Sequence, residues 1–144
     1  MKTNKLKIDE QVLIHALQDS GTPGTYYLNV ITGEIVLVNE YGDFELEELE
    51  NEIEEHSEDF LSIEPINSSQ AHQIMVDFVE HLEDKNIQER LFTVLERKKP
   101  FYHFKESLID YPELRKQWFD YENAQLKEIA REWLENNDLI ADLI

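Results

Sequence analysis

Cysteine is absent from the 144-residue sequence, which excludes disulfide bonds, thiol nucleophiles and cysteine-ligated zinc. Glycine is scarce, and its four positions do not form the clustered pattern by which backbone loops cradle phosphates. No G-x-S-x-G elbow marks a serine hydrolase. From these absences we predict no catalytic, cofactor-binding or metal-binding residues.

Long apolar runs are also missing. No window approaches the roughly 20 apolar residues that a membrane-spanning helix needs. The basic start, MKTNKLKIDEQ, is not followed by the apolar stretch of a signal peptide. We therefore expect a cytoplasmic protein with no membrane partner.

Basic residues are absent from one half of the chain. Residues 8–84 contain 20 acidic side chains and not one lysine or arginine, whereas residues 85–144 are close to balanced. Most of the net charge of −19 therefore falls in the N-terminal half. The electrostatic field of this negative charge repels nucleic acid and attracts basic partners, so we expect a basic protein as partner and no nucleic acid. The alternative is that the acidic surface only keeps the protein soluble.

The length suits one domain, and 41% hydrophobic residues are enough for a packed core. Apolar periodicity predicts helices near residues 9–19, 43–57, 67–82, 86–95, 100–109 and 113–136. Runs rich in β-branched and aromatic residues predict a hairpin over 25–31 and 34–38 and a short strand over 60–64. The fold class is thus α+β: a helix-dominated single domain, with a small antiparallel sheet of a hairpin plus one short strand near the N-terminus. Residues 1–7 are expected to form a flexible basic tail, and the apolar residues 139–144 to dock on the domain.

Helix boundaries carry their own signals. Asp9 is expected to cap the first helix and Asp43 the acidic one, while Asn67 with Gln70 and Asn86 with Glu89 have the spacing of capping boxes. Pro100 suits a first helical turn and is expected to hold Lys99 extended. Phe101 and Phe104 then anchor the new helix.

The predicted helix over residues 43–57 has a narrow apolar stripe and a glutamate-rich remainder. Like charges three and four residues apart cost a few tenths of a kcal/mol each, and no nearby lysine or arginine relieves them. We therefore predict an acidic face that docks a basic partner; imitation of nucleic acid is an alternative. The face comprises Glu45, Glu47, Glu48, Glu50, Glu52, Glu54 and Glu55.

A basic cluster around Pro100 is the second candidate site. Arg97, Lys98, Lys99 and Lys105 could bind an anion, with Tyr102 and His103 beside them. The alternative is a solvated turn whose cations lie near the carboxyl end of the preceding helix, where they are favoured. The sequence favours this structural interpretation.

An enzyme remains the alternative to an interaction module. Its acid and base groups would lie in a cleft between the sheet and the C-terminal helices. They would come from Glu34, Asp77, His81, His103 and Lys105. Asp77 and His81 lack a third metal ligand at a suitable spacing, and Glu58 with Asp59 lacks the pattern of a calcium loop. Trp118 and Trp133, about four helical turns apart, are expected in the core rather than at a cofactor.

In an ordered set of short sequence motifs, the chain resembles a bacterial family of unknown function, uncharacterised protein family 0158. These motifs are Tyr27-Leu28-Asn29, Thr32-Gly33-Glu34, Met75 with Asp77 and Phe78, Phe101 with Phe104 and Lys105, Tyr111-Pro112-Glu113-Leu114-Arg115, Trp118-Phe119, Ile129-Ala130 and Glu132-Trp133-Leu134. Relatives tend to carry a Gly-containing turn where this chain has Lys98-Lys99-Pro100, and arginines where it has Tyr102-His103. The resemblance implies no established activity or cofactor. From the charge asymmetry and the absence of a catalytic constellation, our functional hypothesis is a non-enzymatic, cytoplasmic interaction or regulatory module.

Overall fold

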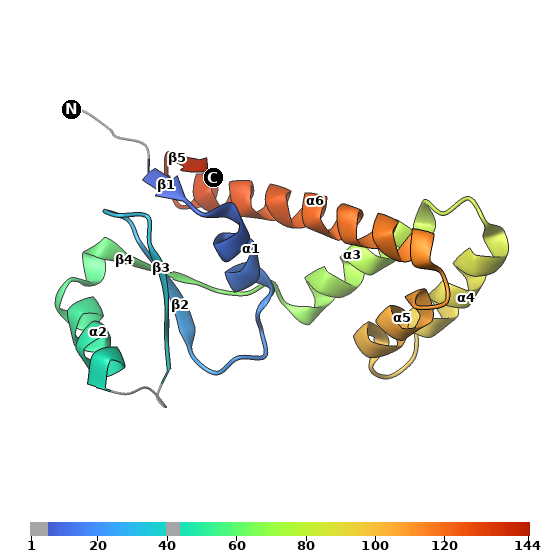
Figure 1. Ribbon diagram of the computed structural model, residues 1–144, viewed down its shortest axis with the longest axis horizontal. Coiled ribbons are helices and arrows are strands. Elements are labelled where there is room, and N and C mark those ends of the chain that lie inside the picture. The colour runs from blue at the N-terminus through green and yellow to red at the C-terminus, as the bar shows by residue number, and fades with distance from the viewer. Residues whose placement is uncertain (1–5, 40–43) are drawn as a thin grey trace. The chain divides into compact units, whose positions relative to one another are not determined.

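A computed structural model of the chain describes residues 6–39 and 44–144 (Figure 1). The chain forms two compact units. Unit 1 comprises Met1–Ile66 and Lys127–Ile144, and unit 2 comprises Asn67–Leu126. The α+β class is confirmed, while the prediction of a single domain stays a prediction.

Unit 1 contains the predicted antiparallel sheet. It is built from β2 (Thr25–Asn29), β3 (Ile35–Val38) and β4 (Phe60–Ile63), in the order β3-β2-β4. Leu28 of β2 is opposite Ile35 in β3 and Leu61 in β4. The hairpin and the short third strand are therefore confirmed, with strands shorter than predicted.

The turn between β2 and β3 is held by side-chain and backbone geometry. The Asn29 side-chain oxygen accepts hydrogen bonds from the backbone N–H groups of Ile31 (2.8 Å) and Thr32 (3.1 Å). Gly33 has a φ of 83°, and a Cβ at this position would collide with the carbonyl oxygen of Lys7. The turn therefore requires glycine both for its conformation and for its close approach to β1.

A second, two-stranded sheet joins the chain ends of unit 1. The strands β1 (Leu6–Ile8) and β5 (Ala141–Leu143) run parallel and lie side by side (Figure 1). Leu6 and Lys7 thus belong to a strand rather than to a flexible tail; residues 1–5 lie outside the described part of the chain. The predicted docking of the apolar C-terminus is confirmed for Leu139 and Leu143, which pack against the core of unit 1, whereas Ile140 and Ile144 are exposed.

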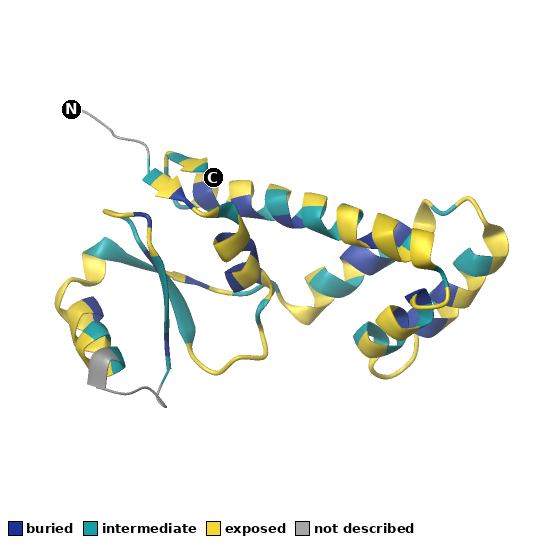
Figure 2. Ribbon diagram, in the orientation of Figure 1, coloured by how far each residue is buried: buried dark blue, intermediate teal, exposed yellow. Residues whose placement is uncertain are grey.

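Helix α1 (Glu10–Gln18) packs into the core of unit 1. Its cap is Asp9, as predicted, whose side chain accepts hydrogen bonds from the backbone N–H groups of Gln11 and Val12. Figure 2 shows buried and exposed residues alternating along α1. Val12 of this helix is 40% exposed. The buried cluster consists of Ile8, Leu13, Ala16, Leu17, Leu28, Ile63, Ala130 and Leu134.

Unit 2 is helical. It consists of α3 (Ser68–Glu80), α4 (Lys85–Leu95), α5 (Pro100–Leu108) and the first part of α6 (Pro112–Asn136), whose last part belongs to unit 1. The capping box of Asn67 and Gln70 is confirmed by reciprocal hydrogen bonds of 2.8 and 3.2 Å. The box predicted at Asn86 is wrong. Asp84 caps α4 instead, because its carboxylate accepts from the backbone N–H groups of Asn86 and Ile87.

Aromatic side chains form the centre of unit 2. The ring of Trp118 lies 5.0 Å from that of Phe104 and 5.4 Å from that of Phe78, both in edge-on contacts. Phe104 is fully buried and Trp118 is buried, as predicted, whereas Phe101 and Trp133 are only half-buried. No helix among the described residues is long and apolar enough to cross a membrane.

Candidate functional site

The acidic helix of the sequence forms α2 (Phe44–Glu55), followed by the short 3-10 helix η1 (Ser57–Asp59). Ile53 is buried, and Leu46 and Leu49 are half-buried. This narrow apolar stripe leaves most of α2 exposed (Figure 2). The predicted cap, Asp43, and the side chain of Glu45 lie outside the described part of the structure. The remaining glutamates of the predicted face are all exposed: Glu47, Glu48, Glu50, Glu52, Glu54 and Glu55.

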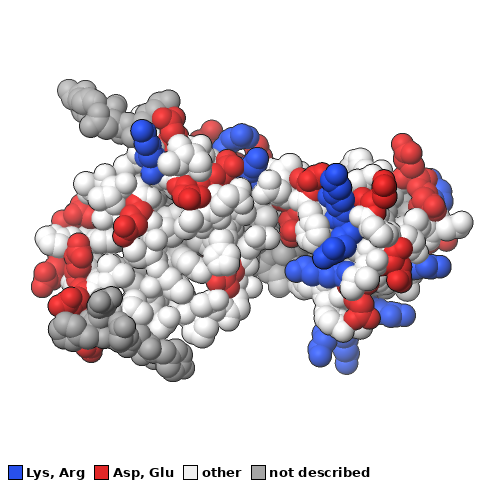
Figure 3. All heavy atoms as spheres, viewed as in Figure 1, with Lys and Arg blue, Asp and Glu red and all other residues white. Residues whose placement is uncertain are grey.

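These glutamates have no compensating charge within the described side chains. No ion pair there involves a glutamate of α2. On the face drawn in Figure 3, the atoms around α2 include many acidic groups and no lysine or arginine. A helix that carries only one sign of charge is weakened by repulsion at i,i+3 and i,i+4 spacing.

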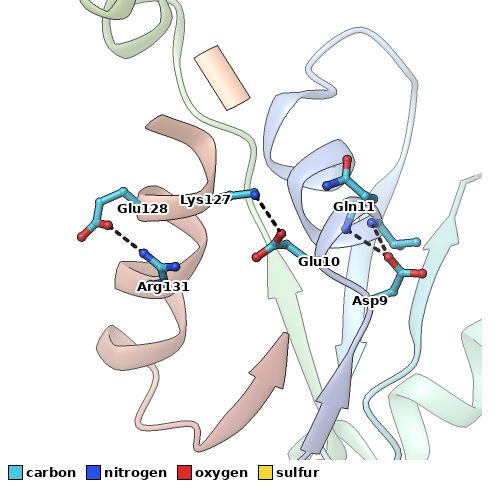
Figure 4. A network of polar contacts seen from close by, with 7 residues as sticks. Asp9, Glu10, Gln11, Lys127, Glu128 and Arg131 are labelled. Carbon is cyan, nitrogen blue, oxygen red and sulfur yellow. Dashed lines mark hydrogen bonds and ion pairs between the residues drawn. The ribbon is translucent and has the colours of Figure 1, made fainter. Parts of the chain in front are cut away.

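Elsewhere in unit 1, acidic groups do lie near cations. Figure 4 shows Lys127 of α6 pointing toward Glu10 of α1, with a separation of 3.7 Å. Arg131 pairs with Glu128 at 3.2 Å on α6. Among the described side chains, the lack of a paired cation is therefore a property of α2 rather than of every acidic surface in this unit.

A further acidic group follows α2 directly. His56, Glu58 and Asp59 each offer one ligand atom, and these atoms lie within 4.8 Å of one another. They could hold a metal ion, although exposed acidic groups often lie together without one. The sequence drew attention to Glu58 and Asp59 but missed His56. The 3-10 turn brings His56 back toward them, and no simple sequence period marks that turn.

The predicted basic cluster divides between a turn and a helix. Arg97, Lys98 and Lys99 are exposed and directly follow the C-cap residue of α4, Glu96, where positive charge is favoured. Lys105 lies on α5 and lines a pocket of about 410 Å³ together with Arg115. The other three cations do not line this pocket. The sequence missed Arg115 because the residue is ten positions away and on another helix.

The acid and base groups of the enzyme hypothesis are engaged separately. The Asp77 carboxylate accepts a hydrogen bond from the side chain of Gln73 at 2.8 Å. The Nδ1 atom of His81 lies 2.7 Å from the backbone oxygen of Asp77, and Glu34 is exposed in the hairpin turn. His81 lines one pocket and Lys105 another. Neither of these two pockets holds three of the five predicted groups.

Comparison with known proteins connects the chain to one family. The model of the uncharacterised protein family UPF0158 matches residues 3–142. A UPF0158 protein of Pseudomonas aeruginosa is 38% identical over 141 residues, which cover 96% of this chain and 87% of the relative. No solved structure matches the chain.

Proposed function

The chain belongs to the uncharacterised protein family UPF0158, and we propose that it acts as a non-enzymatic interaction module of the cytoplasm. The glutamate face of α2 is its docking surface, and the partner is a basic protein. The observation that carries the proposal is that six exposed glutamates share one helix with no cation paired to them among the described side chains.

The physical reason lies in the electrostatics of α2. Repulsion among the glutamates costs a few tenths of a kcal/mol per pair, and the buried stripe of α2 is narrow. A partner that presents lysines or arginines removes this repulsion as it binds. Complementary charge also speeds encounter and discourages acidic competitors.

The test compares two variants of equal net charge. The α2 variant carries Glu47→Gln, Glu50→Gln and Glu54→Gln, and the control carries Glu128→Gln, Glu132→Gln and Glu135→Gln on α6. All six positions are exposed. Tagged protein is used to capture partners at low and high salt, and crosslinking with mass spectrometry locates the contact. Surface charge contacts weaken as salt screens them.

The proposal predicts a basic protein that crosslinks to α2 at low salt. The α2 variant should lose this protein, while the α6 control should retain it. Equal loss in both variants would mean that net charge alone drives capture, and the docking surface would be rejected. An equal amount of captured protein at low and high salt would also count against the proposed docking surface.

A further inference from the structure

The pocket that contains Lys105 is built entirely from α5, α6 and the turn between them. Lys105, Glu106 and Tyr102 come from α5, and Arg115, Trp118 and Phe119 come from α6. All of these residues belong to unit 2. The volume of about 410 Å³ lies within the range of roughly 300–1,000 Å³ that is typical of small-molecule sites.

The walls of the pocket include large apolar side chains that are unusually exposed to solvent. Phe119 is 46% exposed and Ile109 is 64% exposed, although both are large hydrophobic side chains. Phe119 directly follows the buried Trp118 on α6. Consecutive residues of a helix point about 100° apart, so Trp118 enters the aromatic core while Phe119 remains at the pocket.

The charge of the pocket is opposite to that of the protein. Lys105 and Arg115 both line it, and Glu106 is its one lining carboxylate. The guanidinium carbon of Arg115 lies 5.0 Å from the ring centre of Phe119, which holds the cation beside an apolar wall. Among the lining residues, the two cations thus outnumber the single carboxylate, although the whole chain has a net charge of −19.

Glu122 does not line the pocket but is close enough to Lys105 to be influenced by its charge. Burial raises the pKa of the Glu122 carboxyl, and the nearby ammonium of Lys105 opposes that increase. Glu106 in turn interacts with the Tyr102 hydroxyl, where the hydrogen bond between them raises the pKa of the tyrosine. Arg115 has no carboxylate partner among the described side chains, so its guanidinium is available to a ligand.

We propose that this pocket binds a small carboxylate that carries an aromatic or aliphatic group. The carboxylate pairs with Arg115 and Lys105, and the apolar group lies against Trp118 and Phe119. Arg115 suits this role because a guanidinium can donate two parallel hydrogen bonds to one carboxylate. Trp118 also lines the pocket, and its buried indole N–H makes no hydrogen bond to the described residues, so its NMR signal can report on binding nearby.

The test uses phenylacetate as the probe, phenylacetamide as its neutral counterpart and acetate as the anion without an apolar group. The chain has two tryptophans, so its NMR spectrum contains two indole N–H signals, which a Trp133→Phe variant assigns. Phenylacetate should shift the Trp118 signal saturably. Phenylacetamide and acetate should each bind at least about tenfold more weakly, because each lacks one of the two recognised groups.

Variants separate this site from general attraction of anions. Arg115→Gln and Lys105→Gln should each weaken phenylacetate binding by about threefold to tenfold. Lys116→Gln makes the same change of charge at an exposed position outside the pocket and should have no effect. The proposal is overturned if phenylacetate does not shift Trp118 saturably, if phenylacetamide binds as tightly, or if Lys116→Gln weakens binding as much as Arg115→Gln does. Measuring each variant's amide spectrum confirms that it is folded.

Discussion

The hydroxyl group of Tyr26 donates a hydrogen bond of 2.7 Å to Oδ2 of Asp19. Asp19 is the C-cap residue of α1 and Tyr26 lies in β2, so this bond ties the end of the helix to the central strand of the sheet. The other carboxylate oxygen, Oδ1, accepts from the backbone N–H of Thr22 at 3.1 Å, and Nε2 of His15 lies 3.6 Å from Oδ2. One side chain therefore organises the loop between α1 and β2.

The first prediction concerns the acid stability that depends on Asp19. Hydrogen bonds from Thr22 and Tyr26 lower the pKa of this carboxyl from 3.8 to about 2. A lowered pKa in the folded state means that the contribution to stability is present above pH 3.8 and is lost as pH falls toward 2. Asp19→Asn should be less stable than the wild type at pH 5, and the difference should shrink between pH 4 and 2. Urea unfolding at each pH measures it.

Tyr26→Phe is the matched control for Asp19→Asn. It removes one donor but leaves the backbone N–H of Thr22 in place, so the carboxylate should keep part of its preference for the charged form. The variant should therefore show a smaller dependence on pH than the wild type and a larger one than Asp19→Asn. Parallel stability curves for the wild type and Asp19→Asn would contradict the assignment.

The second prediction is that Glu122 has the opposite effect to Asp19 on how stability depends on pH. Burial raises the pKa of this carboxyl above its usual value of 4.5, against the opposing effect of Lys105. A raised pKa means that stability is lost as pH rises through the value in the folded state. Glu122→Gln should therefore raise the melting temperature at pH 7, and the gain should disappear below pH 4.5. A loss of melting temperature at pH 7 would show that the charged carboxylate is stabilised in the fold.

Sequence periodicity predicted the long elements of this fold because each has a continuous apolar stripe. It failed where two local choices were equivalent or where pairing was distant. Asp84 and Asn86 are both good caps two residues apart, and only the carboxylate geometry of Asp84 decides between them. The strands β1 and β5 have three residues each, and their pairing joins opposite ends of the chain, so no local pattern identifies them.

The candidate sites differ in the same way. The glutamates of α2 could be listed from the sequence because they surround one helix with a recognisable stripe. The pocket could not be predicted, since Lys105 and Arg115 lie on different helices and meet only through the packing of α5 on α6. The exposure of Phe119 likewise depends on how the neighbouring Trp118 is oriented in the core.

The third prediction separates stability from function on α2. Glu50→Lys places a cation three residues after Glu47 and four residues before Glu54, so two repulsive pairs become attractive. We expect a gain of about 0.5 kcal/mol in the stability of α2, which hydrogen exchange of its amides can measure. The same substitution should weaken capture of a basic partner. Glu50→Gln should give a smaller gain, and no gain from either variant would show that repulsion does not limit the helix.

The last prediction concerns the start of α5. Lys99 was expected to be extended but has a φ of 55° and a ψ of 53°, in the left-handed region, because the chain must turn within the four residues between α4 and α5. This conformation is unfavourable for a residue with a Cβ, and the proline that follows adds a further clash. Lys99→Gly should stabilise the protein by about 0.5–1 kcal/mol in urea unfolding, after the greater freedom of glycine in the unfolded chain is subtracted. Lys98→Gly removes the same charge at a neighbouring residue without a positive φ and should be neutral or destabilising. If both variants change stability equally, the removal of charge and not the backbone conformation is responsible.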